Sequence, residues 1–198
     1  PAGFLPQYQP GTLPATDAQQ ELATGYPLGK RFKSAETVRV SDAVPVQIGH
    51  HHRADGRYRI YAFADADRTQ LNAWAEWMLT SPESPLQQFT PAGDDIDSVF
   101  DVKAIYQQGH RDIEFGEVPK VFLPKVGPFQ LVDYEKVYAA GSGDTSHGTG
   151  EDIFAERGVS RDGAIVVVRP DHYVAHILPL TARAELTEFF GGFLAQRG

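Results

Sequence analysis

The chain of 198 residues contains no cysteine. Because thiol–disulfide exchange, thiol nucleophiles and cysteine-ligated zinc all need a thiolate, the sequence excludes each of them. It also lacks a run of about 18 apolar residues, so no transmembrane helix is expected, and no basic-then-apolar leader marks a secretory signal. Since nothing directs the chain elsewhere, we expect a cytoplasmic protein without a membrane partner.

Basic residues are in deficit as well. The chain carries 18 Lys and Arg against 26 Asp and Glu, for a formal net charge of -8. Binding to a phosphate backbone needs a basic patch, so nucleic acid is not an expected partner. The remaining composition, 41% hydrophobic and 22% charged, is typical of a globular protein, and the length suits one domain with or without an arm.

The first 30 residues are rich in proline and glycine. This density forbids a regular helix there, apart from a short helical turn from Asp17 to Ala23. The apolar residues of the segment would be unusual in a solvated linker, so we expect it to pack on another surface. Short strands are expected at residues 37–40 and 44–48, the second at a sheet edge, where proline is tolerated. Residues 1–52 are therefore interpreted as an extended arm with edge strands, and 53–198 as the main domain.

A junction between a strand and a helix organises the main domain. After Tyr58 and Arg59, residues 60–63 form an apolar run typical of a buried strand. An amphipathic helix follows, with Trp74 and Met78 in its apolar stripe. Asp67 and Gln70 match a capping box and are predicted to start this helix. Such junctions often hold the chemistry of α/β proteins, but residues 64–68 offer no nucleophile, thiol or glycine cradle. We expect the junction only to join a central strand to a packing helix.

The later elements complete a recognisable order. A strand at 99–106 makes a right-handed, parallel βαβ unit with the first strand. Residues 107–150 show no regular pattern and are interpreted as a long excursion that covers a surface. A short helix then ends at Gly158, strands at 164–168 and 173–178 form a hairpin, and a final helix is predicted to be capped by Thr181. This order, β-α-β, insertion, α-β-β-α, is that of the α/β thioredoxin fold, with a mixed sheet of four strands.

Two sets of residues are candidates for metal or acid–base chemistry. Three histidines occupy positions 50–52, and because an extended chain alternates its side chains, at most His50 and His52 could share a metal. A solvated histidine turn is the favoured interpretation. The second set is His110, Asp112 and Glu114. These would share one face of an extended segment, but no facing partner is evident, so a polar loop face is favoured.

A loop and a dipeptide each differ from a known motif. The loop at 141–148 is rich in glycine, but it lacks the Gly-Lys-Ser/Thr ending of a phosphate-binding loop and carries Asp144, so a plain surface loop is favoured. Gly163-Ala164 precedes the strand at 164–168, where the thioredoxin fold places a cis-proline. The sequence therefore predicts a thioredoxin-like domain without thioredoxin chemistry.

Three segments resemble one family of enzymes. They are Gly-Arg-Tyr-Arg-Ile-Tyr-Ala-Phe at 56–63, Leu-Val-Asp-Tyr-Glu-Lys-Val-Tyr at 131–138, and the stretch 163–175, which contains Val-Arg-Pro-Asp-His-Tyr-Val-Ala. They look like the C-terminal domain of the phenol 2-monooxygenase and 3-hydroxybenzoate 4-monooxygenase family of FAD-dependent aromatic hydroxylases. The third segment is the most specific, and the resemblance covers nearly the whole chain, including residues 24–29.

The resemblance implies a division of labour. In that family a larger N-terminal region binds FAD and the phenolic substrate and uses NAD(P)H, while the thioredoxin-like C-terminal domain supports dimerisation and packs on the catalytic part. No catalytic, cofactor-binding or metal-binding residue carries over to this chain. We therefore expect a non-catalytic C-terminal portion of a longer polypeptide that forms a homodimer. The candidate interface residues are Phe4, Tyr8, Tyr26, Trp77, Phe122 and Phe129.

Two alternatives stay open at this point. The first is a free-standing enzyme or metal-binding protein that uses His50, His52, His110 and Asp112. The second is a redox-inactive thioredoxin-like module that binds some other partner.

Overall fold

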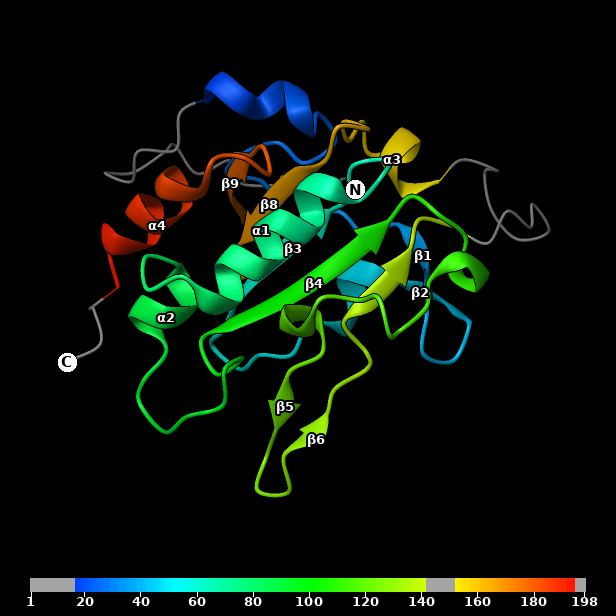
Figure 1. Cartoon of the computed structure of the whole chain (residues 1–198). Helices are drawn as coiled ribbons and strands as arrows, with labels where there is room; N and C mark the ends of the chain where they lie inside the picture. The colour runs from blue at the N-terminus through cyan, green and yellow to red at the C-terminus, as the bar shows by residue number, and fades with distance from the viewer. Residues whose placement is uncertain (1–16, 142–151, 195–198) are drawn as a thin grey trace.

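The computed structural model describes residues 17–141 and 152–194, which are built around one mixed sheet (Figure 1). Seven strands form this sheet in the order β2-β1-β7-β4-β3-β8-β9. Their bounds are β1 Glu36–Arg39, β2 Val44–Gln47, β3 Tyr58–Phe63, β4 Phe100–Tyr106, β7 Val137–Ala139, β8 Ala164–Val168 and β9 Val174–Leu178. A separate two-stranded hairpin consists of β5 Lys125–Val126 and β6 Leu131–Val132.

Helices complete the element order. The α-helices are α1 Thr69–Thr80, α2 Pro85–Phe89, α3 Ile153–Glu156 and α4 Arg183–Gly191. Four short 3₁₀ segments are η1 Asp17–Leu22, η2 Ile48–His51, η3 His110–Asp112 and η4 Lys120–Phe122. None of the helices in the described ranges combines the length and the apolar character that crossing a bilayer requires.

The predicted core of the fold is present. Strand β3 pairs in parallel with β4, and α1 connects the two, which confirms the βαβ unit. On its other side β3 pairs with β8 in antiparallel orientation, and β8 and β9 form the predicted hairpin. Helix α3 precedes β8, and α4 follows β9, so the order predicted from the sequence is confirmed.

The sheet is larger than the four strands predicted. Strand β7, which lies inside the excursion 107–150, is inserted between β4 and β1, parallel to β4 and antiparallel to β1. Its three residues are all buried. The expectation that this excursion only covers a surface is therefore corrected, because part of it extends the sheet. Strands β1 and β2 continue the same sheet, and the division of the chain at residue 52 stays a prediction.

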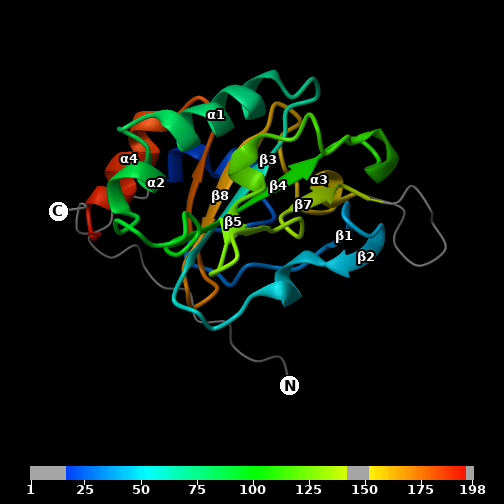
Figure 2. The same ribbon diagram turned by 60° about the horizontal axis from the view of Figure 1, so that its bottom comes forward.

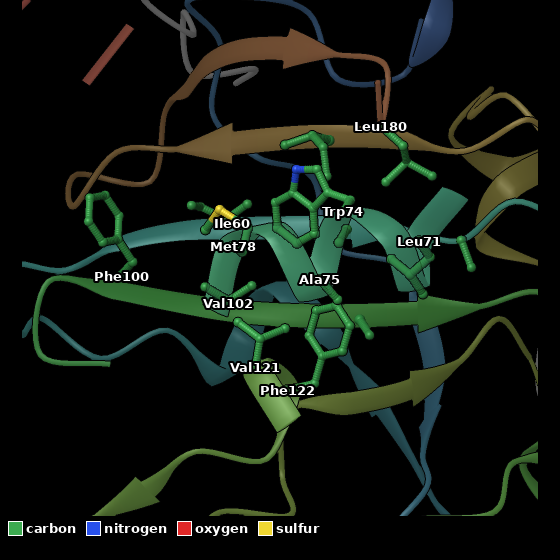
Figure 3. Close-up of a cluster of buried hydrophobic side chains, with 14 of the residues drawn as sticks. Ile60, Leu71, Trp74, Ala75, Met78, Phe100, Val102, Val121, Phe122 and Leu180 are labelled. Carbon is green, nitrogen blue, oxygen red and sulfur yellow. The ribbon is translucent and has the colours of Figure 1, made fainter. Parts of the chain in front are cut away.

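Two hydrophobic cores cover the two faces of the sheet. Helices α1, α2 and α4 lie together on one face (Figures 1 and 2), where Trp74 and Met78 of α1 pack over β3 and β4 and against Phe122 of η4 (Figure 3). The apolar stripe predicted for α1 is thus confirmed. On the opposite face Phe32 of the N-terminal segment lies between the rings of Tyr26 and Tyr61, stacked on each with centroids 4.5 Å apart. The predicted packing of the segment's apolar residues holds for its described part.

The helix caps differ from those predicted. Helix α1 begins after Arg68, which adopts a left-handed conformation, and the carboxylate of Asp65 accepts hydrogen bonds from the backbone N–H groups of Gln70 and Leu71 at 2.9 and 3.0 Å. Asp67 accepts from Thr69 N–H, and Gln70 N–H donates to Asp65 and not to Asp67, so the predicted capping box is wrong. The left-handed conformation of Arg68 turns the chain so that the Asp65 side chain reaches the N–H groups in the first turn of α1.

The start of the last helix also differs from the prediction. Ala182 occupies the N-cap position of α4 and provides no side-chain acceptor, so the predicted Thr181 cap is wrong. At α3 the prediction holds: Gly158 follows the helix with a φ of 55°, in the left-handed region that suits glycine after a helix end.

Candidate functional site

The junction between β3 and α1 is filled by the chain itself. The buried Asp65 carboxylate accepts from two N–H groups of the first turn of α1, so these donors are not free to hold an anion or to stabilise a thiolate. Gly163, just before β8, has a φ of 89°, and a Cβ there would overlap the Leu180 side chain and lie 2.9 Å from the Phe63 carbonyl oxygen. The two backbones therefore meet directly, and the described residues contain no cis peptide bond.

The second candidate set does not form the predicted face. Residues 110–112 form the single turn η3, not an extended strand, so the predicted alternation of His110 and Asp112 is wrong. The backbone carbonyl of Asp112 accepts a hydrogen bond from Arg68 Nη2 at 3.0 Å. This contact ties the excursion to the start of α1, beside a polar hollow of about 510 Å³ that includes Arg68 and Glu117 in its lining.

The histidine run at 50–52 belongs to a turn, with only one ring directed into the protein. His50 and His51 lie in η2, while the ring of His52 lies between Tyr61 and His172. Its Nε2 contacts the Tyr61 hydroxyl, and its Nδ1 is 2.5 Å from His172 Nδ1, a hydrogen bond in which one nitrogen donates and the other accepts. Burial, followed by the repulsion from His172, lowers the pKa of His52 to about 3, and the ring is neutral at pH 7.

This histidine cluster joins two segments that are far apart in the chain. It links the residues before β3 to the turn of the β8–β9 hairpin, at the edge of the second core. Across residues 17–141 and 152–194, no group of three or more histidine, aspartate or glutamate side chains is arranged to hold a metal ion. His50 and His110 do not join His52 in any such group.

A buried network of charges lies on the same face of the sheet. Asp101 of β4, only 3% exposed, lies 2.6 Å from Lys136 Nζ, 3.2 Å from Lys103 Nζ and 3.5 Å from Arg59 Nε. Asp101 and Lys103 alternate along β4 with apolar residues, and the structure buries both faces of the strand. Burial raises the pKa of Asp101, but the neighbouring lysines outweigh it and hold the pKa far below its usual range.

The two lysines respond differently to the same carboxylate. Burial lowers the pKa of Lys103, and Asp101 compensates only in part. Burial also acts to lower the pKa of Lys136, but Asp101 and Asp97, whose Oδ2 is 3.0 Å from Lys136 Nζ, outweigh it and the pKa is raised. Because each charge has an opposite partner, the network is a structural feature of the central sheet.

Exposed apolar side chains concentrate in one place. In the described part of the chain, the large hydrophobic residues that are exposed are Phe129 at 83%, Leu131 at 66%, Tyr134 at 47% and Val44 at 43%. The first three belong to the β5–β6 hairpin and the residues directly after it, which extend away from the sheet (Figure 1). We call residues 125–134 the projecting hairpin. The sequence singled out Phe129 but missed Leu131 and Tyr134, because this segment has no periodicity that separates exposed from buried positions.

The other predicted interface residues have different positions. Tyr26 and Phe122 are fully buried in the two cores, so neither has exposed area to offer a partner in this conformation. Trp77 is partly buried against the first core, with the Arg183 guanidinium 6.0 Å from its ring centre. Phe4 and Tyr8 lie outside the described residues, as does most of the loop 141–148.

A solved structure of similar fold defines the class of the domain. The chain is similar to a thiol:disulfide interchange protein from Bacteroides sp., with a TM-score of 0.53, 10% sequence identity, and coverage of 86% of this chain and 91% of that one. At this identity the likeness concerns the fold alone. The domain has a thioredoxin-like fold, as the sequence predicted. The structure adds that the carboxylate of Asp65 occupies the junction after β3.

The family follows from the sequence comparisons. The chain belongs to the family described as the phenol hydroxylase C-terminal dimerisation domain, whose profile matches residues 6–198. It is 44% identical to 3-hydroxybenzoate 4-monooxygenase of Comamonas testosteroni over 98% of the chain, and 29% identical to an FAD-dependent monooxygenase of Aspergillus terreus over 93%. In both cases the match spans only 30% of the relative's length. The predicted family is confirmed.

Proposed function

We propose that this chain is the association domain of an FAD-dependent, NAD(P)H-using hydroxylase that acts on phenol or 3-hydroxybenzoate. The match to a family described by its dimerisation carries the proposal, and the 44% identity to 3-hydroxybenzoate 4-monooxygenase supports the aromatic substrate class. In this proposal the flavin and the substrate belong to a preceding region of the same polypeptide, and the match over only 30% of the relative's length supports this. A cytoplasmic location fits this role.

The domain contributes contacts and no chemistry in this proposal. Its junction is closed by Asp65 and Gly163, and the chain has no thiol. A domain that supports assembly needs exposed apolar surface, and Phe129 and its neighbours provide it. The domain forms a homodimer and packs on the catalytic region. Phe4, Tyr8 and Trp77 remain candidate contacts for one of these two interfaces.

Sedimentation velocity over a concentration series tests the dimerisation. We expect the mass of two chains at micromolar concentration, dissociating to one chain on dilution. A single chain at every concentration would contradict direct self-association. Mixing with the separately produced catalytic region tests the second contact: the two should elute together from a sizing column, with the flavin absorbance contributed by the catalytic region alone.

The alternative of a metal-binding protein has no observation in its favour. His52 is engaged with Tyr61 and His172, and His110 lies in η3, on another segment of the chain. Elemental analysis of the purified chain separates the two functions, because a stoichiometric transition metal would show that association is not the whole role.

A further inference from the structure

The projecting hairpin combines exposed apolar side chains with a fixed backbone. Its turn closes with a hydrogen bond from Gln130 N–H to the Gly127 carbonyl oxygen at 3.0 Å, and its base closes with one from Asp133 N–H to Pro124 at 2.9 Å. Gly127 has a φ of 71°, which suits glycine in a tight turn. The hairpin is therefore held in one conformation although it stands away from the sheet.

A residue from another loop braces this turn. The Asp95 carboxylate, from the loop between α2 and β4, accepts from Gly127 N–H at 2.7 Å and from Gln130 Nε2 at 3.2 Å. At the other end Tyr134 packs edge-on against Phe115, with ring centres 5.2 Å apart, and Phe115 packs against the first core. Such bracing reduces the entropy lost when a partner binds, because the surface is already ordered.

We propose that the projecting hairpin is the centre of the dimer contact, and that its partner is the same hairpin of a second copy of this chain. This inference rests on the proposed function, in which the domain dimerises. In a two-fold contact the same patch lies on both sides, so it must be complementary to itself. The apolar residues are bordered by Lys125 and by Glu135, which are exposed and opposite in charge. Two copies can therefore meet without the repulsion that a border of one sign would cause.

The exposed area of the hairpin's apolar side chains is large enough for the centre of a dimer interface. With typical side-chain areas, Phe129, Leu131 and Tyr134 expose roughly 400 Å² in each copy, about half of the roughly 800 Å² that each partner buries in a standard interface. Apolar residues dominate the centre of such interfaces and polar residues their rim. The neighbouring charged residues supply that rim.

Charge substitutions in the 198-residue chain test the contact. We expect the double variant F129E/L131E to raise the dimer dissociation constant at least about 100-fold, since centre residues dominate binding. The control is Val44→Glu, on edge strand β2. Val44 is the exposed large hydrophobic residue of the described part of the chain that lies outside the hairpin, and its substitution should change the constant less than about 3-fold. Circular dichroism and thermal melting check that both variants fold. A double variant that dimerises like the unsubstituted chain would overturn the inference while dimerisation itself stands.

The absence of cysteine allows an independent test that needs no loss of binding. Phe129→Cys introduces a single thiol. If residue 129 lies near the two-fold axis, this thiol should form a disulfide with the same residue of the second chain under mild oxidation. Val44→Cys is the control and should remain uncrosslinked. Crosslinking at 44 and not at 129 would place the contact on β2 and refute the assignment. An unsubstituted chain that stays monomeric would count against both the hairpin contact and the proposed dimerisation.

Discussion

The buried charge network offers the sharpest test of what stabilises this domain. Asp101→Asn keeps the shape of the side chain and removes its charge. Lys136 would still have Asp97 at 3.0 Å, and Arg59 would still have Asp55 at 2.8 Å. Lys103 would lose the carboxylate 3.2 Å from its Nζ and keep weaker favourable interactions, with the ring of Tyr138, 5.8 Å from its Nζ, and with the charge of Asp133. The cost of the substitution therefore falls mainly on Lys103.

The expected loss of stability follows from removing one partner of a buried ion pair. Removal of one partner leaves an uncompensated buried charge and lowers the free energy of unfolding by about 3–5 kcal/mol. With a urea slope of about 1–3 kcal/mol/M, the unfolding midpoint should fall by roughly 2 M. Replacing Lys103 by Met in the same variant removes the unpaired charge, and we expect it to restore the unfolding free energy to within about 2 kcal/mol of the original.

Urea unfolding at pH 7, followed by circular dichroism, measures both effects in one double-mutant cycle. A loss below about 1 kcal/mol for Asp101→Asn, or no recovery on adding Lys103→Met, would refute this account. The pH dependence gives a second check. Because the pKa of Asp101 is lower in the folded state, its stabilisation is present above about pH 4 and is lost as the pH falls further. Asp101→Asn should remove this part of the acid sensitivity.

Three further outcomes follow from the geometry of the junction and the histidine cluster. Gly163→Ala should lower the free energy of unfolding by about 1–3 kcal/mol, because its φ is 89° and the added Cβ would overlap Leu180; an unchanged thermal midpoint would contradict this. Asp65→Ala should lower the free energy of unfolding, measured in urea, by about 1–2 kcal/mol, a larger loss than that caused by Asp67→Ala. A larger loss for Asp67→Ala would support the capping box predicted from the sequence instead. His52 has a lowered folded-state pKa, so stability should fall as the pH drops from about 6.5 towards 3; His52→Gln should show a shallower decline between pH 7 and 5.

The strongest local patterns were sufficient to predict the central architecture. The helical stripe of Leu71, Trp74 and Met78 specifies α1 through its period, and the unbroken apolar runs at 60–63 and 164–168 specify two buried strands. Their order along the chain limited the topology, because a βαβ unit has one favoured hand. Helix caps were less predictable, since Asp65 and Asp67 are both suitable acceptors and only the left-handed Arg68 decides between them.

Strand β7 could not be predicted from the sequence pattern. Three residues do not reveal a period, and their pairing with β4 and β1 depends on segments far away in the chain. The same limit applies to the candidate interface. Tyr26, Phe122 and Phe129 look alike as aromatic residues in irregular segments, yet two are buried in opposite cores and one is exposed on the projecting hairpin. Burial in such segments depends on tertiary packing, which spacing does not encode.

The sequence alone determined that these 198 residues cannot supply a thiol, because they contain no cysteine. It also determined the order of the central strands and helices, since each has a local apolar pattern, an unbroken run in the buried strands and a helical stripe in the helices. Only the tertiary structure decided which charges are buried together at Asp101, which aspartate closes the strand–helix junction, and which aromatic residues remain available to a partner. These depend on contacts between segments far apart in the chain, and their free energies arise only when folding removes the groups from water.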